Sequence, residues 1–342
     1  GNIPSYNLQN LKTISLSRNK LTGEIPNFQL LKLETIALSF NQLTGSIPPF
    51  NLPNLYHLAL DANKLSGKIP DFNLPKLQFL YLDGGNKLSG TLPNFHSPDL
   101  VDLYLGGNNL SGSIPIFNFP KIKNLYLGNN NFSGNVPNFN FPILKTLYLH
   151  GNNLDGNLPY MNLPELELFY IHDNKISGTI PTLNMPLLQS IWLSSNHFTF
   201  SGLYQFYPNS FSIFYISPQA KIPTFTTSNC TTLFVKAGGV TAHNTYKWYR
   251  LGRGLVATIV GDSPYTPALA GEYYCEVTNN VVNGLTLVSE TIQIGSANTS
   301  ISGTTSFCAG GSTTLDAGSG YASYQWSNGA VGQTITVNAS GT

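Results

Sequence analysis

One pattern recurs with a step of 22 residues through the first 200 residues of the chain. The stretch 55–76, LYHLALDANKLSGKIPDFNLPK, has the skeleton L-x-x-L-x-L-x-x-N-x-L-x-G-x-I-P-x-F-N-x-P-x. Its leading apolar position is filled by Leu11, Leu33, Leu55, Leu77, Leu100, Ile122, Leu144, Leu166 and Leu188. The step lengthens once, where Asp83-Gly84-Gly85 adds a residue. A fixed period of this length predicts a solenoid, in which each copy is one coil that buries its apolar face only against its neighbours.

The central part of each copy is predicted to be a short strand. Alternate residues of a strand face opposite sides, so Leu58 and Leu60 point inward, and His57, Ala59 and Asp61 point outward. The copies then stack as one parallel sheet, whose outward residues form the concave surface of the solenoid.

Three further positions have structural roles. The asparagine column lies where the chain leaves the strand, and its amides can bond to backbone groups that would otherwise be buried unpaired. It comprises Asn19, Asn41, Asn63, Asn86, Asn108, Asn130, Asn152, Asn174 and Asn196. A second column is predicted to pack the back of the coil and contains Phe28, Phe50, Phe72, Phe95, Phe117, Phe139, Met161 and Leu183. Prolines such as Pro48 and Pro70 favour an extended return path without helix.

These positions together resemble the leucine-rich repeat family, and L-x-G-x-I-P is similar to its plant-type subclass, which usually runs slightly longer per repeat. The chain starts inside a repeat, because Gly1–Pro4 aligns with Gly23–Pro26. We therefore expect the sequence to be a piece of a longer protein that lacks its first capping element.

The charge of the chain disfavours two classes of partner. Only 10% of the 342 residues are charged, and the formal net charge is +1. A nucleic acid or an anionic membrane would find no electrostatic support here. No apolar run reaches the roughly 20 residues that a membrane-spanning helix needs, so we expect no membrane insertion.

The pattern changes after the ninth repeat. The aromatic-rich stretch 204–220 is expected to cover the last coil, which places the solenoid at 1–220. Short Thr-, Val- and Tyr-rich runs then predict an all-β sandwich over 221–296. Cys230, Trp248 and Cys275 stand out there, with Tyr273 two residues before the second cysteine.

This arrangement resembles an immunoglobulin-like domain, although Leu269 stands where an Asp is usual. The resemblance implies a disulfide between Cys230 and Cys275, with Trp248 packed on it. A disulfide that closes a loop of this length contributes on the order of 4 kcal/mol.

A second, incomplete copy of this domain is predicted over 297–342. Cys308 precedes Trp326 by the same interval that separates Cys230 from Trp248, and the partner of Cys308 is expected beyond residue 342. The module is similar to the tandem immunoglobulin-like repeats of large surface or secreted proteins of Bacteroidetes, often exported by a type IX system. This resemblance implies an extracellular or cell-surface location, and paired cysteines independently suggest an oxidising compartment.

We find no catalytic or cofactor motif, so we expect a protein that is not an enzyme and holds no cofactor. His150 and His172 share one outward column in adjacent repeats, with Asp173 next to the second. These three residues are candidate metal ligands, but the favoured interpretation is two solvated histidines on a polar sheet face, with no metal site.

The most informative feature is the column between the two inward leucines. From the fourth repeat on it is aromatic: Tyr81, Tyr104, Tyr126, Tyr148, Tyr170 and Trp192. At roughly 4.8 Å per repeat, these rings would form a stripe about 24 Å long on the concave face. Gly106 and Gly128 remove side chains beside two of them, which would leave a shallow slot against the rings.

Two interpretations of this stripe remain open. The rings could only stabilise neighbouring strands, each pair by about 0.2–1 kcal/mol. Alternatively, they form a binding platform for a glycan or a protein. We favour non-catalytic binding or adhesion by an exported surface protein. The alternatives are an element that assembles with other proteins or with itself, and an accessory region of an enzyme whose catalytic domain lies outside the sequence.

Overall fold

The computed structural model describes residues 1–204, 212–227, 231–261, 264–295, 301–304, 311–319 and 323–338. The chain divides into two compact units, the first made of 1–266 and 273–292 and the second of 267–272 and 293–342. Among the described residues, no helix is long and apolar enough to cross a bilayer. The boundaries predicted at residues 220 and 296 stay predictions.

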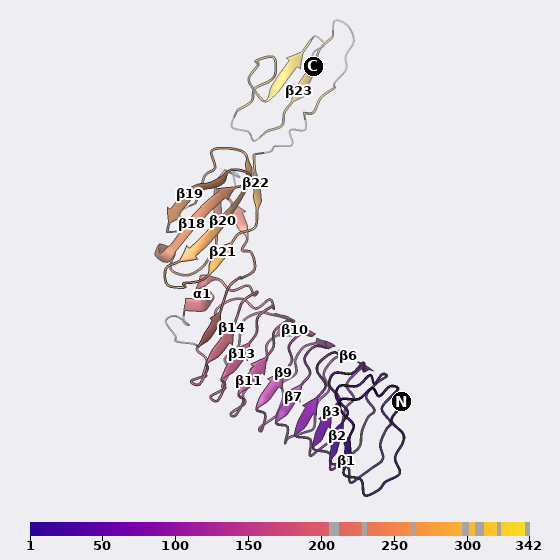
Figure 1. Cartoon of the computed structure of the whole chain (residues 1–342). Helices are drawn as coiled ribbons and strands as arrows, with labels where there is room; N and C mark the ends of the chain where they lie inside the picture. The colour runs from indigo at the N-terminus through magenta and orange to yellow at the C-terminus, as the bar shows by residue number, and fades with distance from the viewer. Residues whose placement is uncertain are drawn as a thin grey trace. The chain divides into compact units, whose positions relative to one another are not determined.

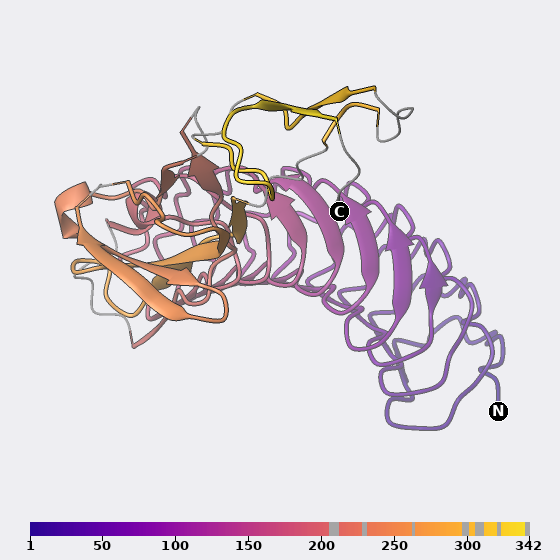
Figure 2. The same ribbon diagram turned by 90° about the horizontal axis from the view of Figure 1, so that it is seen from above.

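The first unit begins with a solenoid whose coils each contribute one strand to a parallel sheet (Figure 1). The ten strands are β1 (Thr13–Ser15), β2 (Thr35–Ala37), β3 (His57–Ala59), β5 (Phe79–Tyr81), β7 (Asp102–Tyr104), β9 (Asn124–Tyr126), β11 (Thr146–Tyr148), β13 (Leu168–Tyr170), β14 (Ser190–Trp192) and β15 (Ile213–Tyr215). Each strand pairs with the next in this order, without a shift in register. Figure 2 shows the strands side by side along the solenoid. The predicted parallel sheet is confirmed.

A second parallel sheet runs along another side of the coils. Its strands are β4 (Ser66–Gly67), β6 (Lys87–Gly90), β8 (Asn109–Gly112), β10 (Asn131–Asn135) and β12 (Asn153–Asp155). The sequence predicted an extended return path without helix, and the path is extended. The sequence did not predict that neighbouring return paths pair with one another.

The asparagine column stabilises the coils as predicted. Asn130 is typical: its amide donates to the carbonyls of Leu105, Leu127 and Gly128 at 3.0–3.2 Å, and its oxygen accepts the backbone N–H of Leu110 at 3.0 Å. The side chain is buried, so these bonds satisfy backbone groups that water does not reach.

In the tenth coil, a glutamine makes the hydrogen bonds to the backbone that an asparagine makes in the other coils. Gln219 Nε2 donates to the carbonyls of Leu193 and Ile216, and its oxygen accepts the backbone N–H of Phe198 at 3.1 Å. Gln219 therefore takes the place of the repeat asparagine in the segment that continues the sheet through β15.

The core of the solenoid consists of the inward leucines and the column of phenylalanines that was predicted to pack the back of the coil. Phe28, Phe50 and Phe72 are 1–3% exposed and stack with ring centroids 6.2–6.4 Å apart. The column is incomplete in the later coils, where Phe95, Phe117 and Leu183 are only half-buried. Phe119 and Met185, two residues after Phe117 and Leu183, are buried there instead.

The rest of the first unit is antiparallel, apart from the short α1 (Phe200–Leu203) and a 3₁₀ turn at Thr241–His243. β16 (Thr224–Thr226) pairs with β17 (Leu233–Val235). The other strands are β18 (Asn244–Arg250), β19 (Gly254–Val260), β20 (Gly271–Asn279) and β21 (Thr286–Val288), with β18 between β19 and β20. The first two residues of β20 and the last two of β22 (Ile292–Ile294) belong to the second unit. Trp248 lies opposite Cys275, and both side chains are at most 1% exposed.

This antiparallel arrangement is mainly β, as predicted, and the immunoglobulin-like topology stays a prediction. Cys230 and Cys308 lie outside the described residues, so the predicted disulfide also stays a prediction. In the second unit, β23 (Thr313–Asp316) and β24 (Thr334–Val337) form an antiparallel pair.

Candidate functional site

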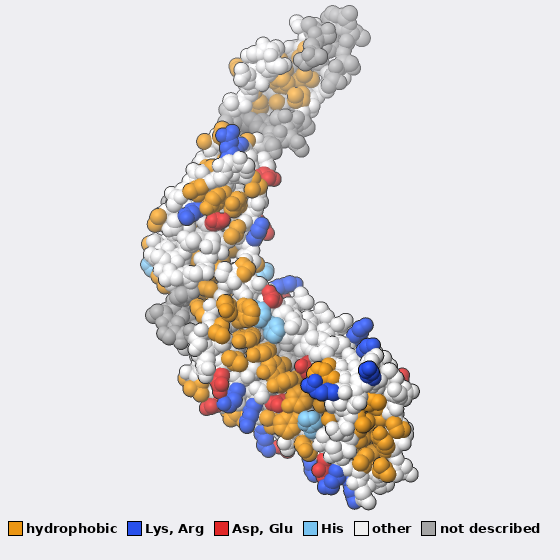
Figure 3. All heavy atoms as spheres, viewed as in Figure 1, with side chains coloured by type: hydrophobic (Ala, Val, Ile, Leu, Met, Phe, Trp, Pro, Cys, Tyr) orange, Lys and Arg blue, Asp and Glu red, His pale blue; other side chains and the backbone are white. Residues whose placement is uncertain are grey.

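The in-register sheet places all six predicted aromatic residues in one row. The strand pairing aligns Tyr81 with Tyr104, and the alignment continues through every strand to Trp192. Tyr215 follows Trp192 in the same row, with ring centroids 5.1 Å apart. The sequence did not predict Tyr215 as part of the row, because the repeat spacing is lost after the ninth copy. We call these seven residues the aromatic column. Figure 3 shows hydrophobic side chains, tyrosine included, gathered in a band over these strands.

Most rings of the column pack edge to face. Tyr104 and Tyr126 have centroids 4.0 Å apart with planes at 78°, and Tyr126 and Tyr148 are 4.5 Å apart at 74°. Tyr148 and Tyr170 instead lie parallel, 4.6 Å apart with planes at 3°. Contacts of this kind contribute about 0.5–1.5 kcal/mol per pair beyond burial, so the rings also stabilise the sheet.

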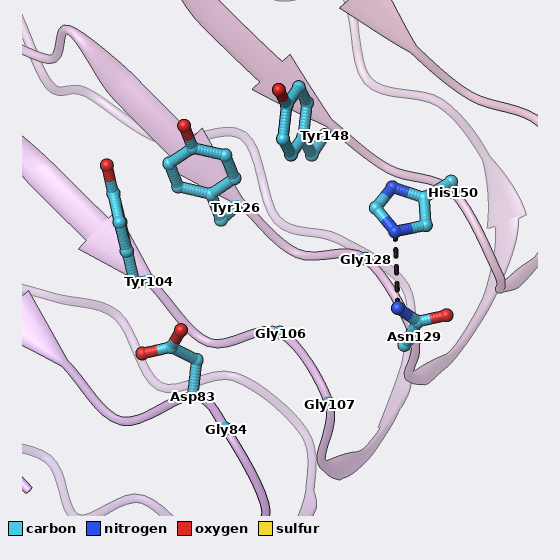
Figure 4. Close-up of a pocket in the computed structure, with 10 residues that line it drawn as sticks. All are labelled: Asp83, Gly84, Tyr104, Gly106, Gly107, Tyr126, Gly128, Asn129, Tyr148 and His150. Carbon is cyan, nitrogen blue, oxygen red and sulfur yellow. Dashed lines mark hydrogen bonds between the residues drawn. The ribbon is translucent and has the colours of Figure 1, made fainter. Parts of the chain in front are cut away.

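The hydroxyls of Tyr104, Tyr126 and Tyr148 point to the same side (Figure 4). Tyr81 donates to Asp102 Oδ2 at 2.7 Å. Burial, followed by a hydrogen bond with Tyr126, raises the pKa of Tyr104. Burial is also the largest cause that raises the pKa of Tyr148 to about 12, with hydrogen bonds to Tyr170 and Tyr126 adding to it. The phenols of Tyr104 and Tyr148 therefore stay protonated at neutral pH and act as hydrogen-bond donors and acceptors, not as bases.

His150 and His172 form a second stack beside the column. Their rings lie 4.7 Å apart with planes at 6°, and the His172 ring lies 3.9 Å from that of Trp192. His172 is 9% exposed, so the expectation of a solvated histidine is wrong for His172, whereas His150 is half-buried. Both histidines lie at outward positions, as predicted. The ring of His172, however, is stacked between those of His150 and Trp192, which cover it from water. Burial lowers the pKa of both imidazoles, which favours their neutral forms.

The ring geometry gives the two imidazoles no shared point at which to coordinate an ion. Parallel imidazoles direct their nitrogen lone pairs in the planes of the rings and not toward a common point, although His172 Nε2 lies 3.7 Å from Asp173 Oδ2. In the part of the chain that the structure describes, no group of three His, Cys, Asp or Glu residues is placed to hold a metal ion.

A slot of about 350 Å³ lies against the middle of the aromatic column. It is lined by Asp83, Gly84, Tyr104, Gly106, Gly107, Tyr126, Gly128, Asn129, Tyr148 and His150 (Figure 4). The slot predicted beside Gly106 and Gly128 is therefore present. A Cβ at Gly128 would lie 2.6 Å from the His150 ring, so a glycine here lets the imidazole lie over the backbone.

The two ends of the slot differ in chemistry. At one end, Asn129 Nδ2 bonds to His150 Nε2 at 3.2 Å, as Figure 4 shows. With the amide nitrogen as donor, Nε2 is the acceptor and the neutral ring carries its proton on Nδ1. At the other end lies the carboxylate of Asp83. Such a slot can bind a side chain by packing, hydrogen bonds and charge.

The comparisons with known proteins identify the repeat. The model of the Leucine Rich Repeat family matches residues 10–29. The search of the curated proteins gave no match. Among solved structures, the ectodomain of the Arabidopsis receptor kinase HAESA, in complex with a peptide hormone, is 33% identical over 56% of this chain and 35% of that chain, with a TM-score of 0.50.

Two other solved structures are also similar. A plant ice-binding protein is 32% identical over 51% of this chain and 60% of that chain, with a TM-score of 0.43. InlP of Listeria monocytogenes is 23% identical over 80% of this chain and 77% of that chain, with a TM-score of 0.48. The chain thus spans less than two thirds of the length of the first two of these three proteins.

The first unit therefore contains a leucine-rich repeat solenoid. Solenoids of this kind present an extended surface on which a partner can lie, and this fold commonly mediates protein binding.

Proposed function

We propose that the chain is a non-catalytic binding region whose aromatic column contacts an extended segment of a peptide or protein. The observation that carries this proposal is the register of the column, which aligns seven aromatic side chains and a slot on one sheet face. Tyrosine and tryptophan dominate the contact energy of protein interfaces, because they combine a large apolar ring with a polar group.

The ring geometry favours a peptide over a glycan. A sugar ring would need an exposed ring face to lie on, but the parallel pair Tyr148 and Tyr170 cover each other, and the edge-to-face pairs cover others. Tyr104, Tyr126 and Tyr148 are half-buried, so part of each side chain remains accessible, and a ring edge with a hydroxyl suits the alternating polar and apolar groups of a peptide. The likeness to a receptor ectodomain solved with a bound peptide hormone supports the same choice.

We also propose that the protein is exported and acts at the cell surface, with the antiparallel domains as a stalk. This proposal is supported by the predicted immunoglobulin-like resemblance, by the expected disulfide between Cys230 and Cys275, and by the likeness to a receptor ectodomain.

The binding proposal is tested by selecting random displayed peptides on the full chain and measuring the Kd of the enriched peptides. Tyr126→Ala combined with Tyr148→Ala is expected to weaken binding at least tenfold, since it removes two central rings. Tyr160→Ala is the matched control, because Tyr160 is 53% exposed and lies outside the column. Circular dichroism confirms that each variant is folded.

Two outcomes would contradict this proposal. If Tyr160→Ala weakened binding as much as the double variant, the peptide would bind elsewhere. If a glycan array gave hits that the double variant lost, while no peptide was enriched, the ligand class would be wrong.

A further inference from the structure

The sheet face that carries the aromatic column is acidic, although the chain is nearly neutral. Three carboxylates face outward from it, those of Asp61, Asp83 and Asp102, and the strand register places no lysine or arginine among them. The outward positions on either side of the column, all within the described residues 1–204, are Thr13, Thr35, His57, Phe79, Asp102, Asn124, Thr146, Leu168 and Ser190, and Ser17, Ser39, Asp61, Asp83, Gly106, Gly128, His150, His172 and Ser194.

Two of these carboxylates have side-chain partners on the same face. Asp102 accepts hydrogen bonds from Tyr81 at 2.7 Å and from Asn124 at 2.8 Å. Asp61 accepts a hydrogen bond from the hydroxyl of Ser39. Both groups are therefore part of the structure of the sheet.

Asp83 differs from the other two. Within the described residues it has no salt bridge, and its stabilising contact is a hydrogen bond with its own backbone amide. Burial is the largest cause that raises the pKa of this carboxyl, and the charge of Asp61 raises it further. Asp61 and Asp83 occupy the same position of adjacent coils, and two like charges placed opposite each other reduce stability. A half-buried carboxylate in this position costs the fold free energy, which is typical of a binding group.

Asp83 lies at the end of the slot away from His150, on the side of Tyr104 (Figure 4). A carboxylate at this end of the slot can pair directly with a cationic group, and the half-buried ring edges beside it can pack against an aliphatic stem. His150, at the other end, is held neutral by burial and does not repel a cation at neutral pH.

We propose that the slot binds a cationic side chain, that of an arginine or lysine in the peptide ligand, with its charged group at Asp83 and its aliphatic stem along Tyr104 and Tyr126. This inference rests on the proposed peptide-binding function and names the residue type that the ligand must contain.

The test uses a synthetic array of random decapeptides with one fixed central residue, which is Arg, Lys, Gln or Glu. The labelled full chain is compared with Asp83→Asn and with the control Asp71→Asn, which makes the same charge change at a side chain that is 71% exposed and off this face. We expect binding to the Arg and Lys sets, about three- to tenfold weaker for Asp83→Asn and unchanged for Asp71→Asn. The melting temperature of Asp83→Asn is expected to equal or exceed that of the wild type.

The outcomes separate the two proposals. The Gln or Glu sets could bind as strongly as the Arg and Lys sets, with Tyr126→Ala abolishing that binding. This result would overturn the cationic slot and leave the peptide-binding face intact. Equal loss in Asp71→Asn and Asp83→Asn would also overturn the slot, because it would show a long-range charge effect. If no set bound the wild type, both proposals would fail.

Discussion

The imidazole of His150 lies parallel to that of His172, with ring centroids 4.7 Å apart and planes at 6°. Each ring shields the other from water, and burial lowers the pKa of both. For His172, the proximity of His150 lowers the pKa further, and Asp173 opposes the shift. The fold therefore favours the neutral form of both rings.

This stack predicts that the solenoid loses stability in mild acid. Below the ordinary histidine pKa of about 6.5, the unfolded chain binds protons that the folded chain does not, so the free energy of unfolding falls as the pH falls. Urea unfolding at pH 7.5 and pH 5.5 measures the effect. The double variant His150→Gln and His172→Gln should show a smaller change between the two pH values. An equal change in variant and wild type would assign the acid sensitivity to other groups.

Gly128 is predicted to be required because of His150 and not because of backbone strain. In Gly128→Ala the new Cβ would lie 2.6 Å from the His150 ring, and displacing that ring costs about 1–3 kcal/mol. The same substitution should cost much less in a His150→Ala background, where the ring is absent. A double-mutant cycle in urea measures the coupling. Additive costs would show that the ring does not set the requirement for glycine.

The asparagine column is predicted to contribute strongly to stability. Asn130→Ala would leave the buried backbone N–H of Leu110 without its partner and would remove one of two donors from the carbonyls of Leu105 and Leu127, at a cost of about 1–3 kcal/mol. The adjacent Asn131 is exposed on β10, so Asn131→Ala should change the free energy of unfolding by about 0.5 kcal/mol or less. Denaturant titration of the two variants compares the same chemical change at a buried and an exposed position.

The cysteines provide a separate prediction. Cys275 is fully buried, and as a free thiol its pKa would be raised to about 12 by burial. If Cys230 and Cys275 form the predicted disulfide, iodoacetamide in denaturant will modify them only after reduction. Mass spectrometry of the digested chain shows which residues carry the label. Labelling of both before reduction, in protein purified under oxidising conditions, would disprove the pairing.

Much of the solenoid could be predicted from the sequence, because its period fixes the register. Once the step of 22 residues was recognised, Tyr104 and Tyr126 had to lie on adjacent strands and point the same way. The slot followed from Gly106 and Gly128 for the same reason.

The features that the sequence did not predict depend on departures from the period or on side-chain orientation. Tyr215 and Gln219 follow a stretch without repeat spacing, so their equivalence to Trp192 and the repeat asparagine was not visible. The position of His150 was predictable, but its stacking was not, because a position on a sheet face does not define the orientation of a ring. Asp61 and Asp102 have side-chain hydrogen-bond partners on the sheet face, whereas Asp83 has none among the described residues. The sequence alone does not distinguish these three carboxylates.

Hydroxyl-radical footprinting of the full chain, with and without a selected peptide, tests whether a peptide lies on the aromatic column. We predict that the peptide reduces oxidation of Tyr104, Tyr126 and Tyr148 and leaves that of the exposed Tyr160 unchanged. If the three column tyrosines oxidise equally with and without saturating peptide, the column is not the binding surface and serves only to stabilise the sheet.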